Sequence, residues 1–334
     1  MNLIDKTVLT VACSAFIPLC SVAQRPVLKY NRDGAFKIVQ FTDLHFKKNV
    51  AASNAALECI HTILDKESPD LVIFTGDLIY APPADEALLA VLDPVISRKI
   101  PYAVTWGNHD DEQGMNRSDL QKIVESQPYN CGFTAEGVTG KSNFVLRVES
   151  SRSDKIENIL YCFDSNAYAS DPNVKGYDWI KADQIAWYRS QNAYFKDLNG
   201  DKPIPALAFY HIPVPEFSIA AKDESAKLLG YRMERSCPPN LNSGLFTAMF
   251  QGGDVMGHFV GHDHDNDYAV YWKGVLLAYG RFSGGKTEYY NLPVTNGARV
   301  IQLQEGKRDF KTYIRQTDGK VMHEINYPGD FKKK

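Results

Sequence analysis

The placement of histidine constrains this sequence more than any other feature. Five of the eight histidines in the 334-residue chain follow directly on runs of β-branched and aromatic residues that predict strands. They are His45, His109, His211, His262 and His264. Because ligands of open α/β sheets bind beyond the carboxyl ends of the strands, we expect these side chains to converge on one crevice.

From Phe36 onward, strand patterns alternate with amphipathic stretches, which predicts an α/β fold. The first strands are expected at 37–41, 70–74 and 102–105, with helices at 54–66 and 85–98 between them, so the fold opens as a βαβαβ unit. Later strands are expected at 143–148, 159–163, 206–210 and 256–260, with helices at 182–191 and 243–251. The last four, at 268–272, 275–279, 300–303 and 310–314, have no helices between them and predict antiparallel structure.

Oxygen donors stand at the same strand ends as the histidines. Asp43, Asp77 and Asn108 would each, taken alone, be read as turn or helix-cap residues. Together with the imidazoles they form a donor set that suits a pair of transition-metal ions, because carboxylates bridge metals and imidazole favours Zn, Fe, Ni and Mn over Ca or Mg. Two such ions can clamp an in-line displacement at phosphorus, so the donor set points to phosphoryl chemistry.

Five motifs occur in one order along the chain: Asp43-Leu44-His45, Gly76-Asp77, Gly107-Asn108-His109-Asp110, an isolated His211 after a strand, and Gly261-His262-Asp263-His264. This order resembles the calcineurin-like metallophosphoesterase superfamily, which includes the purple acid phosphatases, over roughly residues 36–279. The resemblance implies a four-layer α/β/β/α sandwich in which two mixed sheets are flanked by helices.

The resemblance also assigns roles to residues. It makes Asp43, His45, Asp77 and His264 the ligands of one ion, and Asp77, Asn108, His211 and His262 the ligands of the other, with Asp77 as the bridge. It implies that His109 protonates the leaving oxygen or stabilises the transition state, and that Asp110 orients it. His109 adjoins a ligand and cannot easily bind the same metal, so its imidazole is free to face substrate.

Tyr80 is a further possible ligand. The segment Gly76-Asp77-Leu78-Ile79-Tyr80 reproduces the GDxxY motif of purple acid phosphatases, in which the tyrosine binds ferric iron. Those enzymes typically carry DxG as the first motif, whereas this chain has Asp43-Leu44-His45, so an imidazole competes for that coordination position. We expect His45 to bind and Tyr80 to pack beside the site, because two residues along an extended chain project to the same side.

Other polar residues have weaker assignments. Arg281 follows a strand and is either a possible substrate-binding residue or a loop anchor. His258 is expected to be a buried, hydrogen-bonded residue, and His61 and His323 are expected at the surface. Asp265 and Asp267 are expected on a solvated face or behind the ligands. The long polar connections 166–177, 216–227 and 232–242 are expected to shape substrate access.

Composition and the N-terminus bear on partners and compartment. A formal net charge of −3 provides no basic field for coating a nucleic acid, so a small-molecule or compact phosphoester is the expected partner, and the oligomeric state is open. The apolar run 7–20 is too short to span a membrane; Lys6 precedes it and Ser21-Val22-Ala23 follows it. We expect a signal peptide over 1–23, export to the periplasm or medium, and a mature chain without a transmembrane segment.

Residues 24–334 are therefore expected to form a single catalytic domain with its core at about 36–315. The expected activity is that of an exported binuclear-metal phosphatase, with Fe, Mn or Zn as the two ions. In this scheme a metal-bound hydroxide attacks a phosphate monoester. A phosphodiesterase on the same metal core is the enzymatic alternative, and a non-catalytic metal- or phosphate-binding envelope protein is the alternative of another class. Among the cysteines, Cys59 and Cys162 are expected to be buried, and Cys131 and Cys237 are candidates for a disulfide.

Overall fold

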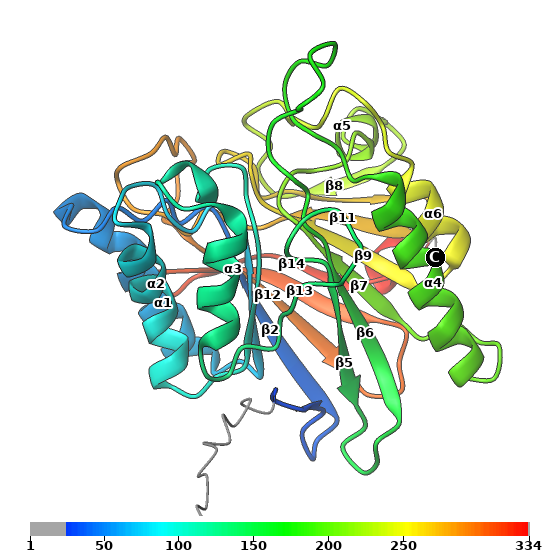
Figure 1. The fold of residues 1–334 in the computed structure, drawn as a ribbon. Coiled ribbons are helices and arrows are strands. Elements are labelled where there is room, and N and C mark those ends of the chain that lie inside the picture. The colour runs from blue at the N-terminus through cyan, green and yellow to red at the C-terminus, as the bar shows by residue number, and fades with distance from the viewer. Residues whose placement is uncertain (1–24, 333–334) are drawn as a thin grey trace, which may run out of the picture.

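Two mixed β-sheets face each other and carry helices on their outer surfaces (Figure 1). The computed structural model describes residues 25–332, and the expected signal peptide over 1–23 lies outside them. No helix in this described part of the chain is long and apolar enough to cross a membrane.

The six-stranded sheet has the order β14-β13-β12-β2-β3-β4. Its parallel half confirms the predicted βαβαβ unit: β2 (Ala35–Phe41), α1 (Asn54–Glu67), β3 (Leu71–Thr75), α2 (Ala84–Ser97) and β4 (Tyr102–Thr105). Its antiparallel half is formed by β12 (Gly297–Gln304), β13 (Phe310–Gln316) and β14 (Val321–Tyr327). Helix α3 (Arg117–Ser126) lies beside α1 and α2 on the outer face (Figure 1).

The eight-stranded sheet has the order β1-β5-β6-β7-β9-β11-β10-β8. Its strands, in chain order, are β1 (Leu28–Lys29), β5 (Phe144–Glu149), β6 (Ile156–Cys162), β7 (Ala206–Phe209), β8 (Lys227–Leu229), β9 (Val255–Val260), β10 (Ala269–Trp272) and β11 (Val275–Tyr279). The four central strands β6, β7, β9 and β11 are parallel, so their carboxyl ends share one edge. The helices of this half are α4 (Ala182–Leu198), α5 (Glu216–Ala220) and α6 (Leu245–Gly252).

Strand alternation creates three apolar layers, which is why the four-layer arrangement is stable. In β2, Phe36 and Ile38 pack between the sheets, whereas Val39 and Phe41 pack under α1 and α2. In β9, Met256 and Phe259 join the layer between the sheets, and Val260 joins the layer under the second set of helices. Full burial of a large apolar side chain contributes about 1.5–3 kcal/mol, so each layer holds its neighbours firmly. The predicted sandwich of two mixed sheets is confirmed.

Several elements carry too little pattern to be predicted. Strand β8 has three residues, and β14 (Val321–Tyr327) buries only Ile325 and Tyr327, so neither shows strong alternation. The candidate disulfide between Cys131 and Cys237 is not formed: all four described cysteines are free, with Cys131 buried in the layer between the sheets and Cys237 exposed.

Candidate metal centre

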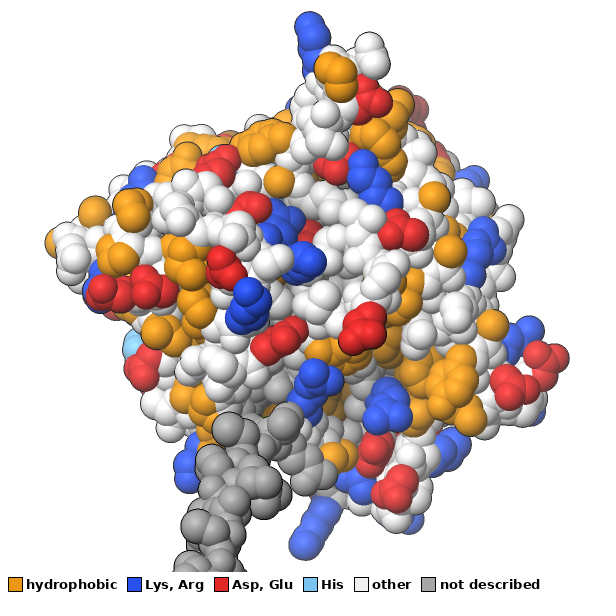
Figure 2. Space-filling model, viewed as in Figure 1, with side chains coloured by type: hydrophobic (Ala, Val, Ile, Leu, Met, Phe, Trp, Pro, Cys, Tyr) orange, Lys and Arg blue, Asp and Glu red, His pale blue; other side chains and the backbone are white. Residues whose placement is uncertain are grey.

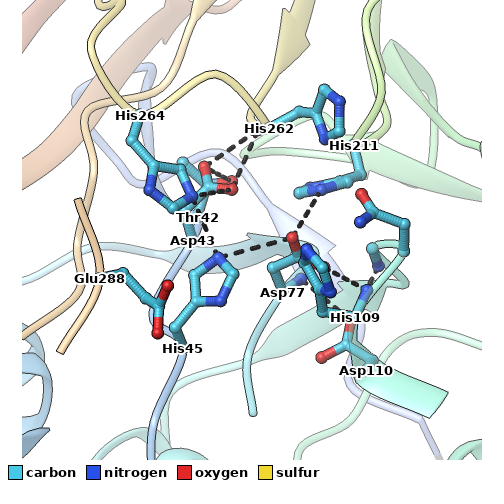
Figure 3. Close-up of polar contacts among 12 residues, drawn as sticks. Thr42, Asp43, His45, Asp77, His109, Asp110, His211, His262, His264 and Glu288 are labelled. Carbon is cyan, nitrogen blue, oxygen red and sulfur yellow. Dashed lines mark hydrogen bonds and ion pairs between the residues drawn. The ribbon is translucent and has the colours of Figure 1, made fainter. Parts of the chain in front are cut away.

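The predicted strand ends converge, and they come from both sheets of the sandwich. The loops after β2, β3 and β4 meet the loops after β7 and β9 where the carboxyl edges of the two sheets come together (Figure 3). All seven candidate ligands are buried there: Asp43, His45, Asp77, Asn108, His211, His262 and His264.

The loops are tightly turned. Asp43, His45, Asp77 and His262 have φ values of 54°, 43°, 53° and 80°, in the left-handed region that non-glycine residues rarely occupy. The segment Asp43-Leu44-His45 is therefore not extended, and the argument from a two-residue repeat is wrong. The turns bring both side chains to the site instead, held by bonds from Asp43 N to Gly76 O at 3.1 Å and from His45 N to Asp77 O at 2.9 Å.

Glycine is required where these loops cross. A Cβ on Gly261 would lie 1.9 Å from Thr42 Oγ1, and a Cβ on Gly107 would lie 2.1 Å from Asp77 Oδ1. Both distances are far inside van der Waals contact. The glycines of the last and third motifs therefore permit the close approach of backbone to ligand.

One donor group consists of Asp43, His45 and His264. The Nε2 atoms of His264 and His45 are 3.1 Å apart, and His264 Nε2 is 3.7 Å from Asp43 Oδ1. His264 Nδ1 lies 3.0 Å from the carbonyl oxygen of Tyr289, a contact in which the ring donates and Nε2 is left with its lone pair. The Asp43 carboxylate accepts hydrogen bonds from His262 N and from Thr42 Oγ1.

A second donor group consists of Asp77, His211 and His262. His211 Nε2 lies 3.1 Å from Asp77 Oδ2, and His211 Nδ1 lies 2.7 Å from the carbonyl oxygen of Thr75. The Thr75 carbonyl orients the ring in the way that backbone carbonyls orient metal-binding histidines. Asp77 Oδ2 is also 3.5 Å from His45 Nε2, so this carboxylate lies between the two groups, as a bridging ligand must.

Unpartnered polar atoms show that this donor set fits cations. Among the described residues, Asn108 Oδ1 and His211 Nε2 are buried and make no hydrogen bond. A buried polar atom without a partner costs about 1–3 kcal/mol, and a metal ion would satisfy both. Imidazole nitrogens and carboxylate oxygens in this ratio suit Zn, Fe or Mn. The structure thus contains two groups of residues that can bind a dimetal centre.

Burial and neighbouring charges shift the pKa values of the candidate ligands in opposite directions. Burial raises the pKa of Asp43. At Asp77 burial also acts to raise the pKa, but His211 and His45 outweigh it and hold the pKa well below its usual range. Burial lowers the pKa of His45 and of His262, which keeps these imidazoles neutral. At His211 burial acts to lower the pKa, but the Asp77 and Asp43 carboxylates outweigh it and raise the pKa to about 9. Because imidazole binds metals in its neutral form, metal binding at His211 would release a proton.

The predicted role of Asp110 is wrong. Its buried carboxylate accepts hydrogen bonds from the backbone N–H groups of Asp77, Leu78 and Gly107 at 2.7–3.0 Å, so it fixes the loops and does not contact the His109 ring. Instead His109 Nδ1 lies 2.6 Å from Glu112 Oε2. His109 is the N-cap of a 3₁₀ turn over Asp110–Glu112 and Glu112 is its last residue, and in such a turn side chains three residues apart share one side. The sequence analysis missed this contact, although the spacing His109-x-x-Glu112 is a signal for it.

Tyr80 packs against the site. Its ring lies edge-on to His45 and to His109, with centroids 5.0 and 4.9 Å away, and Lys47 Nζ lies 4.7 Å above it. Burial together with the charges of Glu288 and Glu112 raises its pKa. These surroundings disfavour the tyrosinate form of Tyr80.

Arg281 is placed as a loop anchor. Its side chain has no exposed surface; it pairs with Asp267 and donates to Thr295 O at 2.9 Å. A side chain committed in this way cannot reach a substrate phosphate. Asp265 and Asp267 are both buried, so of the two alternatives given for them the solvated face is wrong, and neither residue belongs to a donor group.

The three histidines outside the motifs lie away from the donor groups. His258 is fully buried and lies 2.9 Å from Tyr210 Oη, as predicted for a core histidine. His61 is exposed, as expected, whereas His323 is half-buried near Asp267. None of the three belongs to a donor group.

The two-sheet sandwich and its donor groups together define the metallophosphoesterase class of dimetal proteins. The chain belongs to the calcineurin-like phosphoesterase family, whose model matches residues 36–266. It is 33% identical, over 92% of its length and 86% of the relative's, to the Arabidopsis thaliana protein named "Probable inactive purple acid phosphatase 29". It is 34% identical, over 76% of its length and 48% of the relative's, to "Phosphatase DCR2" of Saccharomyces cerevisiae.

Solved structures share the fold. A dimetal phosphatase from Danio rerio aligns with a TM-score of 0.61 over 87% of this chain and 98% of that chain, at 12% identity. The purple acid phosphatase PPD1 from yellow lupin aligns with a TM-score of 0.54 over 88% of this chain and 54% of that chain, at 14% identity. Identities this low carry an argument about the fold alone.

Proposed function

We propose that this protein is an exported binuclear-metal phosphatase that hydrolyses phosphate monoesters. The observation that carries the proposal is a pair of buried donor groups that meet at one carboxylate, that of Asp77. The groups are Asp43/His45/His264 and Asp77/His211/His262, and Asp77 Oδ2 lies within 3.5 Å of a histidine from each. Structural metal sites are closed by their protein ligands, whereas this centre has the partly exposed His109 beside it.

Each side chain has a role in this proposal. Asp77 would hold both ions, and the amide oxygen of Asn108, which is buried without a hydrogen-bond partner, would join the second ligand set. Two bound transition ions supply the activation of water and the neutralisation of phosphoryl charge. His109, held by Glu112 through Nδ1, presents its remaining ring nitrogen to protonate the leaving oxygen.

A second candidate is supported by the names of relatives. The A. thaliana protein carries the word "inactive", so a metal- or phosphate-binding protein without turnover is the alternative. The retained His109–Glu112 pair favours the enzyme, because a protein that only binds metal has no use for an oriented acid beside it.

Compartment and domain organisation are also part of the proposal. Residues 1–23 are a signal peptide in this view, because the apolar run 7–20 ends at the small residues Ser21-Val22-Ala23. Residues 24–334 then form one catalytic domain, supported by apolar layers that run from β2 to β14 across both sheets.

The experiment is a turnover screen of the purified protein loaded with Zn, Mn or Fe, on an aryl phosphate, a bis-aryl phosphate and diphosphate. We expect the monoester to be hydrolysed fastest, and we expect Asp77→Asn to lose nearly all activity and at least one ion per chain. The exposed Asp93 on α2 supplies the control, since Asp93→Asn should retain both. Two full-occupancy ions and wild-type turnover in Asp77→Asn would contradict the site, and faster diester hydrolysis would replace the monoester assignment.

A further inference from the structure

The connection between β6 and α4 carries two tyrosines to the edge of the metal centre. Tyr168 and Tyr177 stack on one another with centroids 5.6 Å apart and an interplanar angle of 25°. This connection is the green loop at the top of Figure 1, and it projects at the top of the molecule in Figure 2. Neither tyrosine belongs to the donor groups or to the acid pair described above.

The loop is held in shape by its own backbone. Tyr168 and Tyr177 form an antiparallel bridge, flanked by bonds from Ala169 N to Gly176 O and from Asp178 N to Ala167 O, both at 2.9 Å. Asn240 Nδ2 donates to Lys175 O at 2.6 Å and ties the tip to a neighbouring loop. The aromatic pair is therefore a fixed surface that does not need to be ordered by a ligand.

Both rings contact candidate ligands. The Tyr177 ring lies edge-on to His262, with centroids 4.4 Å apart, and Asn108 Nδ2 donates to Tyr168 Oη at 3.3 Å. The Tyr168 ring is also 6.4 Å from the His109 ring. Tyr168 nevertheless remains 49% exposed, although Tyr177 stacks on one of its faces. An aromatic face thus borders the position from which His109 would meet the leaving group.

Two acidic side chains lie at the mouth of the site. Glu288 lies beside His45 (Figure 3), and Glu112 Oε2 lies 2.6 Å from His109 Nδ1. Two nearby cations are paired: Lys47 Nζ lies 2.7 Å from Glu288 Oε1, and Arg117 pairs with Asp164 at 2.6 Å. Additional phosphate groups on a substrate would meet the repulsion of Glu112 and Glu288 here.

We propose that Tyr168, backed by Tyr177, binds the alcohol portion of the substrate by stacking, and that the preferred substrates are monoesters of uncharged aromatic alcohols. This inference rests on the proposed phosphatase function and names its substrate class. One substrate molecule could place its phosphate at the metal centre and its aromatic group on Tyr168 at the same time, because the Tyr168 hydroxyl contacts the side chain of the candidate ligand Asn108.

Direct binding tests the inference without requiring turnover. Benzylphosphonate and cyclohexylmethylphosphonate have similar size and equal charge, but only the first has a π-face. Isothermal titration of the Zn²⁺-loaded protein should show benzylphosphonate binding several-fold more tightly. Tyr168→Leu should lose roughly five- to tenfold in affinity for benzylphosphonate and change little for the cyclohexyl compound, since aromatic pairing exceeds simple burial by that amount.

Two controls separate stacking from other effects. Tyr168→Phe keeps the ring and loses only the bond to Asn108, so it should keep the preference for the benzyl compound. Tyr194 is 55% exposed on α4, away from the site, and Tyr194→Leu should match wild type. Equal affinity of the wild type for both phosphonates, no binding of either, or an equal loss for both in Tyr168→Leu would overturn the inference.

Parallel assays with benzyl phosphate and cyclohexylmethyl phosphate distinguish this inference from the function on which it rests. If neither ester is hydrolysed while Tyr168 still selects benzylphosphonate, the phosphatase proposal fails and the binding surface stands. If both are hydrolysed with equal KM, the phosphatase stands and the stacking surface fails.

Discussion

At the scale of single residues, exposure separates ligands from the candidate acid. His109 keeps 25% of its side chain exposed, whereas the side chains of His45, His211 and His264 are at most 4% exposed. A ligand gains from exclusion of water, and an acid must meet substrate. Exposure therefore supports the division of roles that the motif order suggested.

The acid pair gives a first residue-scale prediction. His109→Ala should keep both metal ions and lower kcat by about 10²–10⁴, the usual contribution of acid catalysis. Glu112→Gln should lower kcat by about 10- to 100-fold with little change in metal content, because it loosens the imidazole without removing it. Steady-state kinetics with leaving groups of different acidity would measure both effects.

The control for this pair is Glu58→Gln, a change at an exposed position on α1 that should have no effect. Losses should shrink for activated aryl leaving groups, which need less protonation. A loss of kcat that is the same for every leaving group would show that His109 acts through its charge alone. If Glu112→Gln had the kcat of the wild type, Glu112 would not be the residue that orients His109.

His45 and Tyr80 give a second residue-scale prediction. His45 Nε2 lies 3.1 Å from His264 Nε2, whereas the Tyr80 ring packs edge-on beside His45. His45→Ala should therefore lose metal and activity, and Tyr80→Phe should keep metal content and most activity. The iron-loaded protein should lack a visible tyrosinate charge-transfer band. A purple protein that Tyr80→Phe bleaches would instead make the tyrosine a ligand.

At the scale of elements, the end of α1 is tied to both halves of the six-stranded sheet. Glu67, the last residue of α1, accepts from Tyr313 Oη at 2.8 Å, pairs with Arg315 Nε at 2.5 Å, both on β13, and pairs with Lys37 Nζ of β2 at 3.1 Å. Burial acts to raise the Glu67 pKa, but these three partners outweigh it and lower the pKa.

This linkage predicts a pH-dependent stability. A carboxyl group with a depressed folded-state pKa stabilises the fold above its unfolded pKa of about 4.3 and loses that contribution as pH falls through the folded value. Glu67→Gln should therefore lower the free energy of unfolding by roughly 1–2 kcal/mol at pH 7 and by much less near pH 3. Urea unfolding at both pH values would measure this, with Glu58→Gln as the control on the same helix. An equal loss of unfolding free energy at both pH values would indicate that Glu67 contributes through packing and not through its charge.

At the scale of the whole molecule, the proposed export predicts a processed chain. Mass spectrometry of the protein isolated from its native source should find Gln24 as the first residue, because Ser21-Val22-Ala23 places small residues at the cleavage site. Ala23→Arg should block processing, since a large charged residue does not fit that position. A native protein that retains Met1 or Lys6 would contradict export.

The sequence by itself determined the parallel βαβαβ unit, the order of the motifs and the identity of the seven candidate ligands. These depend on local signals, namely the period of apolar residues and the chemistry of the side chain that follows each strand. Strand β14 and the short strand β8 were not predicted, because their burial depends on neighbours distant in the chain.

Only the tertiary structure decided which carboxylate contacts which group. Asp110 follows His109 directly, yet its carboxylate turns to the backbone of Asp77 and Leu78, and Glu112 contacts the imidazole. Arg281 and Asp267, fourteen positions apart, form a buried pair across the ends of the antiparallel strands β10 and β11. Hydrogen bonds of this kind depend on turn geometry and on the meeting of two sheets, whereas residue identity reports only what each side chain is able to bind.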